Sequence, residues 1–152
     1  MQIRPDDLTS PQVLALLEAH LRDMRRETPP ESMHALDLSG LRGPGVSFWT
    51  AWSGPELLGC GALKELDPGH GELKSMRTAE AHRHEGVARA MLAHILAVAR
   101  ARGYRRLSLE TGAQPGFEPA RRLYAAAGFR PCPPFASYRP DPLSVFFTLT
   151  LP

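Results

Sequence analysis

The sequence has few cysteines, few aromatic residues and no long hydrophobic run. Its two cysteines, Cys60 and Cys132, lie far apart and form no Cys-x-x-Cys pair, so neither a disulfide framework nor a zinc site is indicated. The apolar stretches are interrupted by Arg, His and Glu, and residues 1–7 contain no apolar segment of the signal-peptide kind. These absences predict a cytoplasmic protein with free thiols and no membrane partner.

The chain also lacks a strong excess of charge of either sign. Eighteen Lys and Arg against sixteen Asp and Glu give a formal net charge of +2. A nucleic-acid-binding domain would show a stronger, one-sided excess with interleaved aromatic residues, whereas these arginines are spaced to lie on solvated helix faces. We expect no nucleic-acid partner. A nucleic-acid- or protein-binding domain built on the Arg clusters stays an alternative, which a salt-dependent shift on a nucleic-acid column would reveal.

Length and composition predict one domain over residues 1–152, because the chain is 43% hydrophobic and long enough for one core only. Ser10 and Pro11 are an N-cap and a first helical residue, and they begin a helix that Thr28 ends. The expected elements of this half are a strand at 2–4, this helix, a short helix at 31–38, and strands at 46–52 and 57–66.

The second half of the chain alternates strands and helices, which indicates an α/β fold. The expected elements are a strand at 72–78, a helix at about 87–102, a strand at 106–110, a helix at 118–127, a loop at 131–142 with five prolines, and a strand at 144–151. The strand, helix and strand from 72 to 110 form a βαβ crossover. Such a crossover requires a parallel pair of strands and tends to place ligands at their carboxyl ends.

Residues 82–90 are the most informative segment, because they place an Arg-x-x-Gly-x-Ala loop directly before an apolar helix. The small side chains of Gly86 and Ala88 let backbone N–H groups at the helix start converge on an anion, with help from the helix dipole. The loop is therefore interpreted as a pyrophosphate cradle, although the pattern alone is more typical of a turn before a surface helix. His82 and His84 have a metal-binding spacing, but no third or fourth ligand is arranged nearby, and we expect no metal.

This loop, the strand before it and the later helix occur in an order that resembles one family. The helix ends in the run Leu-Tyr-Ala-Ala-Ala-Gly-Phe at residues 123–129. Together they resemble the GNAT superfamily of acyl-CoA-dependent N-acetyltransferases, whose loop is Arg/Gln-x-x-Gly-x-Gly/Ala and whose later helix ends Leu-Tyr-x-x-x-Gly-Phe. The resemblance is tightest from Glu72 to Phe129. One departure is Phe117, which stands where that helix usually opens with an Asn that contacts the cofactor.

The resemblance implies a mixed, mostly antiparallel central sheet with helices on both faces and the parallel crossover at the cofactor site. It implies acetyl-CoA as cosubstrate, a small-molecule or peptide amine as acceptor, and a possible homodimer. Transfer would be direct, through a tetrahedral intermediate, rather than through an acyl-enzyme on Cys60 or Cys132. A non-catalytic acyl-CoA-binding regulatory module is the alternative, and the retained Tyr124 counts against it.

The chemistry requires a base and an acid. An alkyl amine has a pKa near 10, so a base must remove a proton before attack, and the departing thiolate needs an acid. The resemblance assigns the acid to Tyr124 and the base to Glu72; from the residues alone, these are also compatible with a core tyrosine and a solvent-facing glutamate. His34 and Glu110 are reserve candidates for the base.

The resemblance also implies which residues bind each substrate. The backbone of residues 76–78 should hydrogen-bond the pantetheine arm, and residues 83–89 should hold the pyrophosphate. The cofactor set is Met76, Arg77, Thr78, Arg83, His84, Glu85, Gly86, Val87, Ala88 and Arg89. The acceptor set, from the first two helices and the loop before the last strand, is Met33, His34, Asp37, Trp49, Tyr138 and Arg139.

Overall fold

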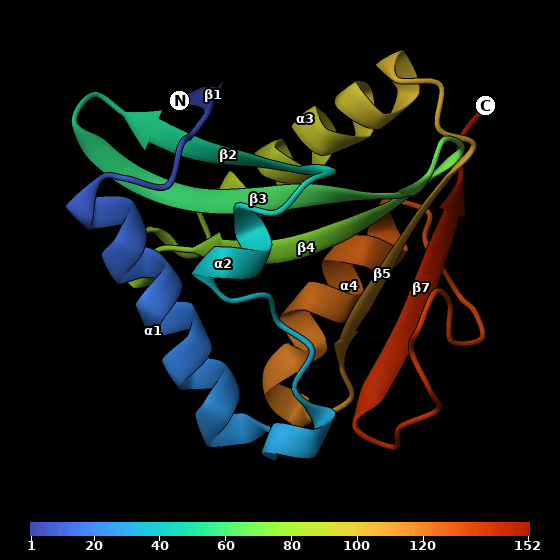
Figure 1. Ribbon diagram of the computed structural model, residues 1–152. Helices are drawn as coiled ribbons and strands as arrows, with labels where there is room; N and C mark the ends of the chain where they lie inside the picture. Colours follow the sequence, from blue (N-terminus) through green and yellow to red (C-terminus); the bar gives the residue numbers. More distant parts are fainter.

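The protein is described by a computed structural model of residues 1–152, in which one mixed sheet of seven strands carries helices on both faces (Figure 1). All neighbouring strands are antiparallel except β4 and β5, which are parallel, as the sequence predicts. In sheet order the strands are β1 Gln2–Pro5, β2 Val46–Ser53, β3 Glu56–Asp67, β4 His70–Thr78, β5 Arg106–Gly112, β7 Ser144–Thr150 and β6 Arg130–Pro131.

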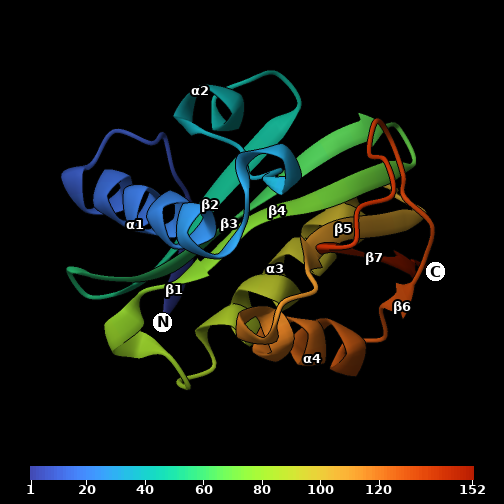
Figure 2. The ribbon, with the colours of Figure 1, turned by 90° about the horizontal axis from the view of Figure 1, so that it is seen from below.

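Four helices lie on the two faces of this sheet: α1 Pro11–Glu27, α2 Leu38–Leu41, α3 Val87–Ala101 and α4 Glu118–Ala126. Figure 2 shows α1 and α2 on one face and α3 and α4 on the other. The predicted start of α1 is confirmed, since the Ser10 hydroxyl accepts a hydrogen bond from the Val13 N–H at 3.2 Å and Pro11 is the first helical residue.

Two apolar cores follow from the alternation of side chains along the strands. On β2, Phe48 and Trp52 pack with α1 and α2, whereas Trp49 and Ala51 pack with α3. Because successive residues of a strand point to opposite faces, this one strand contributes to both cores. The central strands are therefore apolar on both sides, and the few polar residues buried among them stand out.

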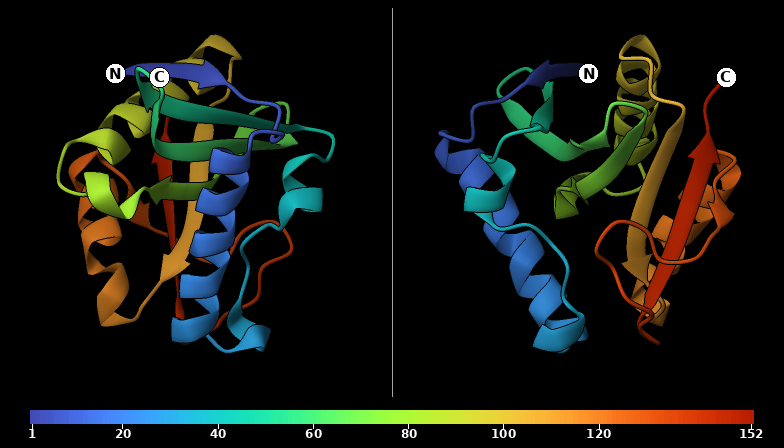
Figure 3. Two further views of the ribbon diagram at one scale, coloured as in Figure 1. Left: turned by 90° about the vertical axis from the view of Figure 1, so that its left-hand side faces the viewer. Right: turned by 45° about the vertical axis from the view of Figure 1, so that its right-hand side comes forward.

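The parallel pairing of β4 and β5 is short and then stops. His70, Gly71 and Glu72 pair with residues 106–108, and no further pair joins the two strands. Beyond Glu72, β4 stays paired with β3 and β5 with β7, so β4 and β5 diverge (Figure 3). Their facing backbone edges are left without a strand partner along a wedge-shaped split in the sheet.

A β-bulge bends β4 within this split. Lys74 pairs with Ala62 and Arg77 pairs with Cys60, so Ser75 and Met76 together oppose the single residue Gly61. Ser75 has a φ of 56°, in the left-handed region. Gly61 leaves space for this arrangement, because a Cβ there would lie 2.9 Å from the Met76 sulfur.

The prediction of a helix at 31–38 is wrong. Only Pro30–Ser32 forms a 3-10 turn, Met33 is extended, and the short helix α2 begins at Leu38. The reason is a stronger local signal: the Asp37 carboxylate accepts the Gly40 N–H at 2.8 Å and so caps a helix that starts after it. The other predicted elements are present with ends shifted by one or two residues.

Candidate active site

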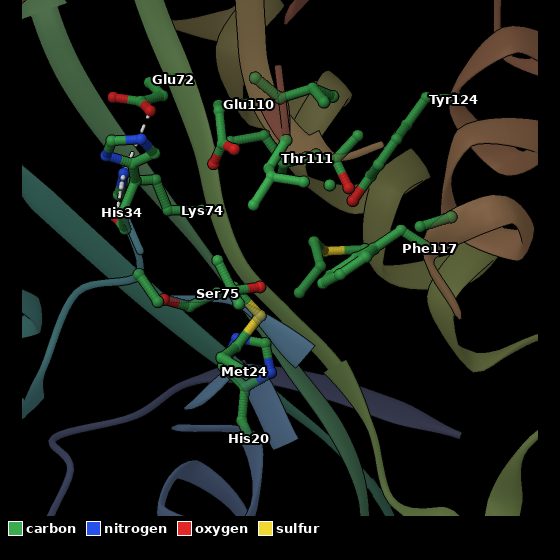
Figure 4. A pocket seen from close by; sticks show the side chains of 18 of the residues that line it. His20, Met24, His34, Glu72, Lys74, Ser75, Glu110, Thr111, Phe117 and Tyr124 are labelled. Carbon is green, nitrogen blue, oxygen red and sulfur yellow. Dashed lines mark hydrogen bonds and ion pairs between the residues drawn. The ribbon is translucent and has the colours of Figure 1, made fainter. Parts of the chain in front are cut away.

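The diverging strands β4 and β5 form one wall of a pocket, which we call the inner cleft (Figure 4). Residues of α1, the segment 32–35, both diverging strands and α4 line it. Within it the backbone of β4 from Leu73 to Met76 faces that of β5 from Leu109 to Gly112. An extended ligand amide inserted here would find unpaired N–H and C=O groups on the strand edges.

The predicted anion cradle lies beyond the end of β4, at the start of α3. Gly86 is the N-cap, with a φ of 83°, and the first helical hydrogen bond runs from the Ala90 N–H to the Gly86 carbonyl at 3.0 Å. The N–H groups of Val87, Ala88 and Arg89 therefore have no acceptor within the helix. A Cβ on Gly86 would meet no atom within 4 Å, so this corner is open. Such an array of free donors at the positive end of a helix suits an anion.

The other predicted cofactor residues lie along the same path. Met76, Arg77 and Thr78 end β4 at the carboxyl edge of the sheet, and Arg83, His84 and Glu85 follow in the exposed loop before Gly86. The Arg77 side chain turns away to α1, where it pairs with Asp23 at 2.7 Å. Only the backbone of Arg77, and not its side chain, is therefore available to a ligand along β4.

Tyr124 projects from α4 into the inner cleft (Figure 4). Its side chain is buried, and its ring packs edge-on against Phe129 at 5.8 Å between centroids. Burial alone raises the pKa of the Tyr124 hydroxyl above its ordinary value. The phenol is therefore neutral at physiological pH and carries a proton that it can donate.

Glu72 is buried, so the alternative of a solvent-facing glutamate does not hold. It is 3% exposed, and its Oε2 lies 3.1 Å from Lys74 Nζ and accepts a hydrogen bond from the Tyr138 hydroxyl. Lys74 also donates to the Tyr138 hydroxyl at 2.8 Å and to the His34 carbonyl at 3.4 Å. We call Glu72, Lys74 and Tyr138 the buried charge network. Each ionic group in it is compensated, as burial requires.

Glu110 and His34 adjoin this network, and both line the inner cleft. Burial raises the pKa of Glu110, while the Ser144 hydroxyl and the charges of His34 and Lys74 oppose the shift. The Nε2 atom of His34 is buried and has no hydrogen-bond partner. A carboxylate with a raised pKa and an imidazole nitrogen without a hydrogen-bond partner thus both line the inner cleft.

A second pocket, the outer cleft, meets the inner cleft at the buried charge network. Residues of β3 and β4, Glu31 and the loop 136–141 line it, and both clefts share His34, Glu72 and Lys74. Of the predicted acceptor residues, His34, Tyr138 and Arg139 line the outer cleft. Met33 and Asp37 line neither cleft.

The prediction for Trp49 is wrong. It lies in the core beneath α3, edge-on to His94 at 5.3 Å, on the face of the sheet opposite α1 and α2. The alternation of β2 decides this, because Phe48 takes the face that α1 covers.

Comparison with known proteins agrees with this architecture. Residues 13–129 match the family model of the acetyltransferase (GNAT) family. The chain is 58% identical over 151 residues to the Bacillus subtilis protein named as the N-acetyltransferase YsnE, covering 99% of this chain and 100% of that protein. The chain belongs to the GNAT acetyltransferase family. It is accordingly an acyltransferase.

Solved GNAT structures share the fold. A Klebsiella pneumoniae structure described as an acyl-CoA N-acyltransferase has 34% identity and a TM-score of 0.81, covering 99% of this chain and 97% of that one. A GNAT acetyltransferase of Elizabethkingia anophelis, solved with acetyl-CoA bound, has 19% identity and a TM-score of 0.69, covering 99% and 97%. The latter likeness concerns the fold alone.

Sequence reasoning missed Lys74 and gave no role to the Phe117 side chain. Lys74 follows Glu72 by two residues on one strand, so the shared face was a readable signal. The ring of Phe117 lines the inner cleft and covers Gly112, where no Cβ would fit. This GNAT member thus presents an apolar ring where the family pattern has an amide.

Neither cysteine is disulfide-bonded, as predicted. Burial raises the pKa of the Cys60 thiol to about 12, and its Sγ lies 3.3 Å from the Ser75 carbonyl. Burial also raises the pKa of Cys132. Both groups are therefore thiols rather than nucleophilic thiolates at neutral pH. No three His, Cys, Asp or Glu residues are grouped as a metal ion would require, and none of the helices is both long and apolar enough to cross a membrane.

We expect Lys74→Met to lower the free energy of unfolding by about 3–5 kcal/mol at pH 7, because Glu72 loses its cation while buried. Urea denaturation measures this. Arg100→Met, exposed on α3 away from the network, is the control and should change stability by less than about 0.5 kcal/mol.

The double variant Lys74→Met/Glu72→Gln should recover most of the lost stability, because no uncompensated charge remains. A loss below about 1 kcal/mol in the single variant would mean that water reaches Glu72 freely.

Proposed function

We propose that this enzyme transfers an acetyl group from acetyl-CoA to a primary amine of a small molecule or peptide, by direct attack. The observation that carries the proposal is the meeting of two clefts at one set of polar groups. The inner cleft extends along the split in the sheet to Tyr124, and the outer cleft meets it at His34, Glu72 and Lys74, which line both clefts. Two substrates can therefore approach one another without a covalent enzyme intermediate.

The inner cleft suits the cofactor. The N–H groups at the start of α3 would hold the pyrophosphate, and the free edge of β4 at residues 76–78 would pair with the amide groups of the pantetheine arm, as an added strand does. The bulge at Ser75 and Met76 bends β4 within this cleft. The acetyl-CoA bound in the Elizabethkingia neighbour supports the same ligand here.

Tyr124 is the proposed acid. When the tetrahedral intermediate collapses, the C–S bond breaks and the sulfur takes the electron pair. The buried, neutral phenol would donate its proton to that sulfur, and α4 would hold it there by its packing on Phe129. Tyr124 is the only tyrosine that lines the inner cleft.

Two carboxylates can take the proton that the acceptor's ammonium group must lose before its neutral nitrogen attacks. Glu72, the candidate from the sequence, already accepts from Lys74 and Tyr138. Burial raises the pKa of Glu110 toward the range where a carboxylate is an effective base. We therefore propose Glu110 as the base, with Glu72 holding Lys74 and Tyr138 at the entrance for the amine.

Gly86→Val should weaken CoA binding at least about tenfold, because its side chain fills the open corner over the free N–H groups. Gly103→Val is a matched control: Gly103 ends the same helix, has a φ of 80° and also meets nothing within 4 Å, so both variants carry the same backbone strain. Calorimetric titration with CoA should find only the first impaired. Equal affinities would place the cradle elsewhere, and no binding to the wild type at millimolar CoA would end the proposal.

Tyr124→Phe should lower turnover by about 10²- to 10⁴-fold and leave CoA affinity and melting temperature nearly unchanged, because it deletes only the proton donor. Tyr104→Phe is the control: Tyr104 is equally buried, but its hydroxyl donates to Glu65 outside both clefts. Turnover of Tyr124→Phe within about threefold of the wild type would make Tyr124 a packing residue. Normal CoA binding with no turnover of any amine by the wild type would instead favour the regulatory module.

Glu110→Gln should lower kcat/KM by about 10²- to 10⁴-fold and abolish its rise with pH. The sign follows from the chemistry: a base acts when deprotonated, so activity increases as the pH rises through the raised pKa of Glu110. Glu72→Gln should keep that rise, with a higher KM for the amine. The opposite pattern, in which only Glu72→Gln loses the pH dependence, would return the role of base to Glu72.

A further inference from the structure

His82 lies between two carboxylates that come from different parts of the chain. Its Nε2 atom is 2.9 Å from Glu56 Oε1, and its Nδ1 atom is 2.9 Å from Glu85 Oε2. Glu56 is the first residue of β3, at the tip of the β2–β3 hairpin, while Glu85 immediately precedes Gly86 in the anion loop. The His82 side chain therefore joins the anion loop to the sheet.

This arrangement requires a protonated imidazole. Ionised carboxylates only accept hydrogen bonds, and a neutral imidazole would direct the lone pair of one ring nitrogen at an oxygen. Contact with both carboxylates is thus favourable only for the cation. The ion-pair contact with Glu56 and the hydrogen bond to Glu85 accordingly raise the pKa of His82 above its ordinary value.

Glu85 is the reason that this cation matters. It is the one acidic residue between Arg83 and Arg89, directly beside the free N–H groups of α3. A carboxylate left free there would repel a bound phosphate group. Held by His82, its charge is compensated, and its oxygens are directed toward the hairpin side. The other titratable or charged groups of the segment 80–89 are Glu80, Arg83, His84 and Arg89. Outside this segment, the charge that faces His82 is that of Glu56 on β3.

We propose that His82 is a positioning residue for cofactor binding: as an imidazolium, it neutralises Glu85 and holds the anion loop in its binding geometry. The inference rests on the proposed function, since it needs CoA phosphates at that loop. Because the folded-state pKa is raised, the cation and both ion pairs are complete below about pH 6.5 and are lost as the pH rises through that pKa. CoA affinity therefore falls with rising pH.

Calorimetric titration with CoA between about pH 6.5 and 9 tests this. In the wild type we expect the Kd to rise by about three- to tenfold over that range. His82→Gln should bind as weakly at all pH values as the wild type does at high pH. Glu85→Gln should bind tightly throughout, and the double variant His82→Gln/Glu85→Gln should bind as tightly as Glu85→Gln. Ionisation of CoA itself affects all variants alike, so the differences between them report on the protein.

His94→Gln is the control for titration of another histidine, since His94 packs against Trp49 away from the loop, and it should keep the wild-type pH dependence. The pKa of the His82 ring, followed by NMR without CoA, gives a separate readout and should fall in Glu85→Gln. A wild-type His82 pKa at or below about 6.5, or CoA binding by His82→Gln equal to that of the wild type at pH 6.5, overturns the inference while leaving the proposed function intact. Failure of the wild type to bind CoA at any pH overturns both.

Discussion

The brevity of the parallel β4–β5 pairing is the constraint on which the rest of the structure depends. A right-handed crossover through α3 requires these strands to be neighbours, and the three residue pairs from His70 to Glu72 satisfy that requirement. Beyond Glu72, each strand follows its antiparallel partner, and the sheet twist separates them. A sheet paired along its full length would have no internal backbone edge to offer a ligand. Tyr124 lines the cleft along this split, and the N–H groups at the start of α3 lie beyond the carboxyl end of the same strand, β4.

The buried charge network is placed at the point where this split begins. Glu72 is the last β4 residue paired with β5, and Lys74 follows it on the same face. Charges are expensive to bury, and an ion pair there stabilises a fold less than apolar residues of similar size would. Its retention in an otherwise apolar sheet is understandable if the group serves chemistry. The same low polarity that makes Glu72 need Lys74 also raises the pKa of the unpaired Glu110.

Local signals made much of this fold predictable. The Ser10 cap, the Pro11 start, the Arg-x-x-Gly-x-Ala loop and the stop at Gly103 each act within a few residues, and each lies where the sequence places it. The error at 31–38 has the same origin, since the local capping signal of Asp37 starts the helix only at Leu38. The prediction that Trp49 helps to bind the acceptor failed for another reason. Both faces of β2 are apolar, so the sequence alone does not say which face each residue takes.

The properties that matter for catalysis were the least predictable, because they are set by residues distant in sequence. Glu72 meets Tyr138 from a loop 66 residues later, and Glu110 becomes a neighbour of His34 only when β5 and the segment before α2 face one cleft. A family motif can identify a tyrosine or a glycine loop. It does not reveal which of two carboxylates is already held by a lysine, and that pairing decides which one is free to accept a proton. The proposed division of roles between Glu72 and Glu110 therefore rests on the packing of the sheet rather than on either residue's position in the chain.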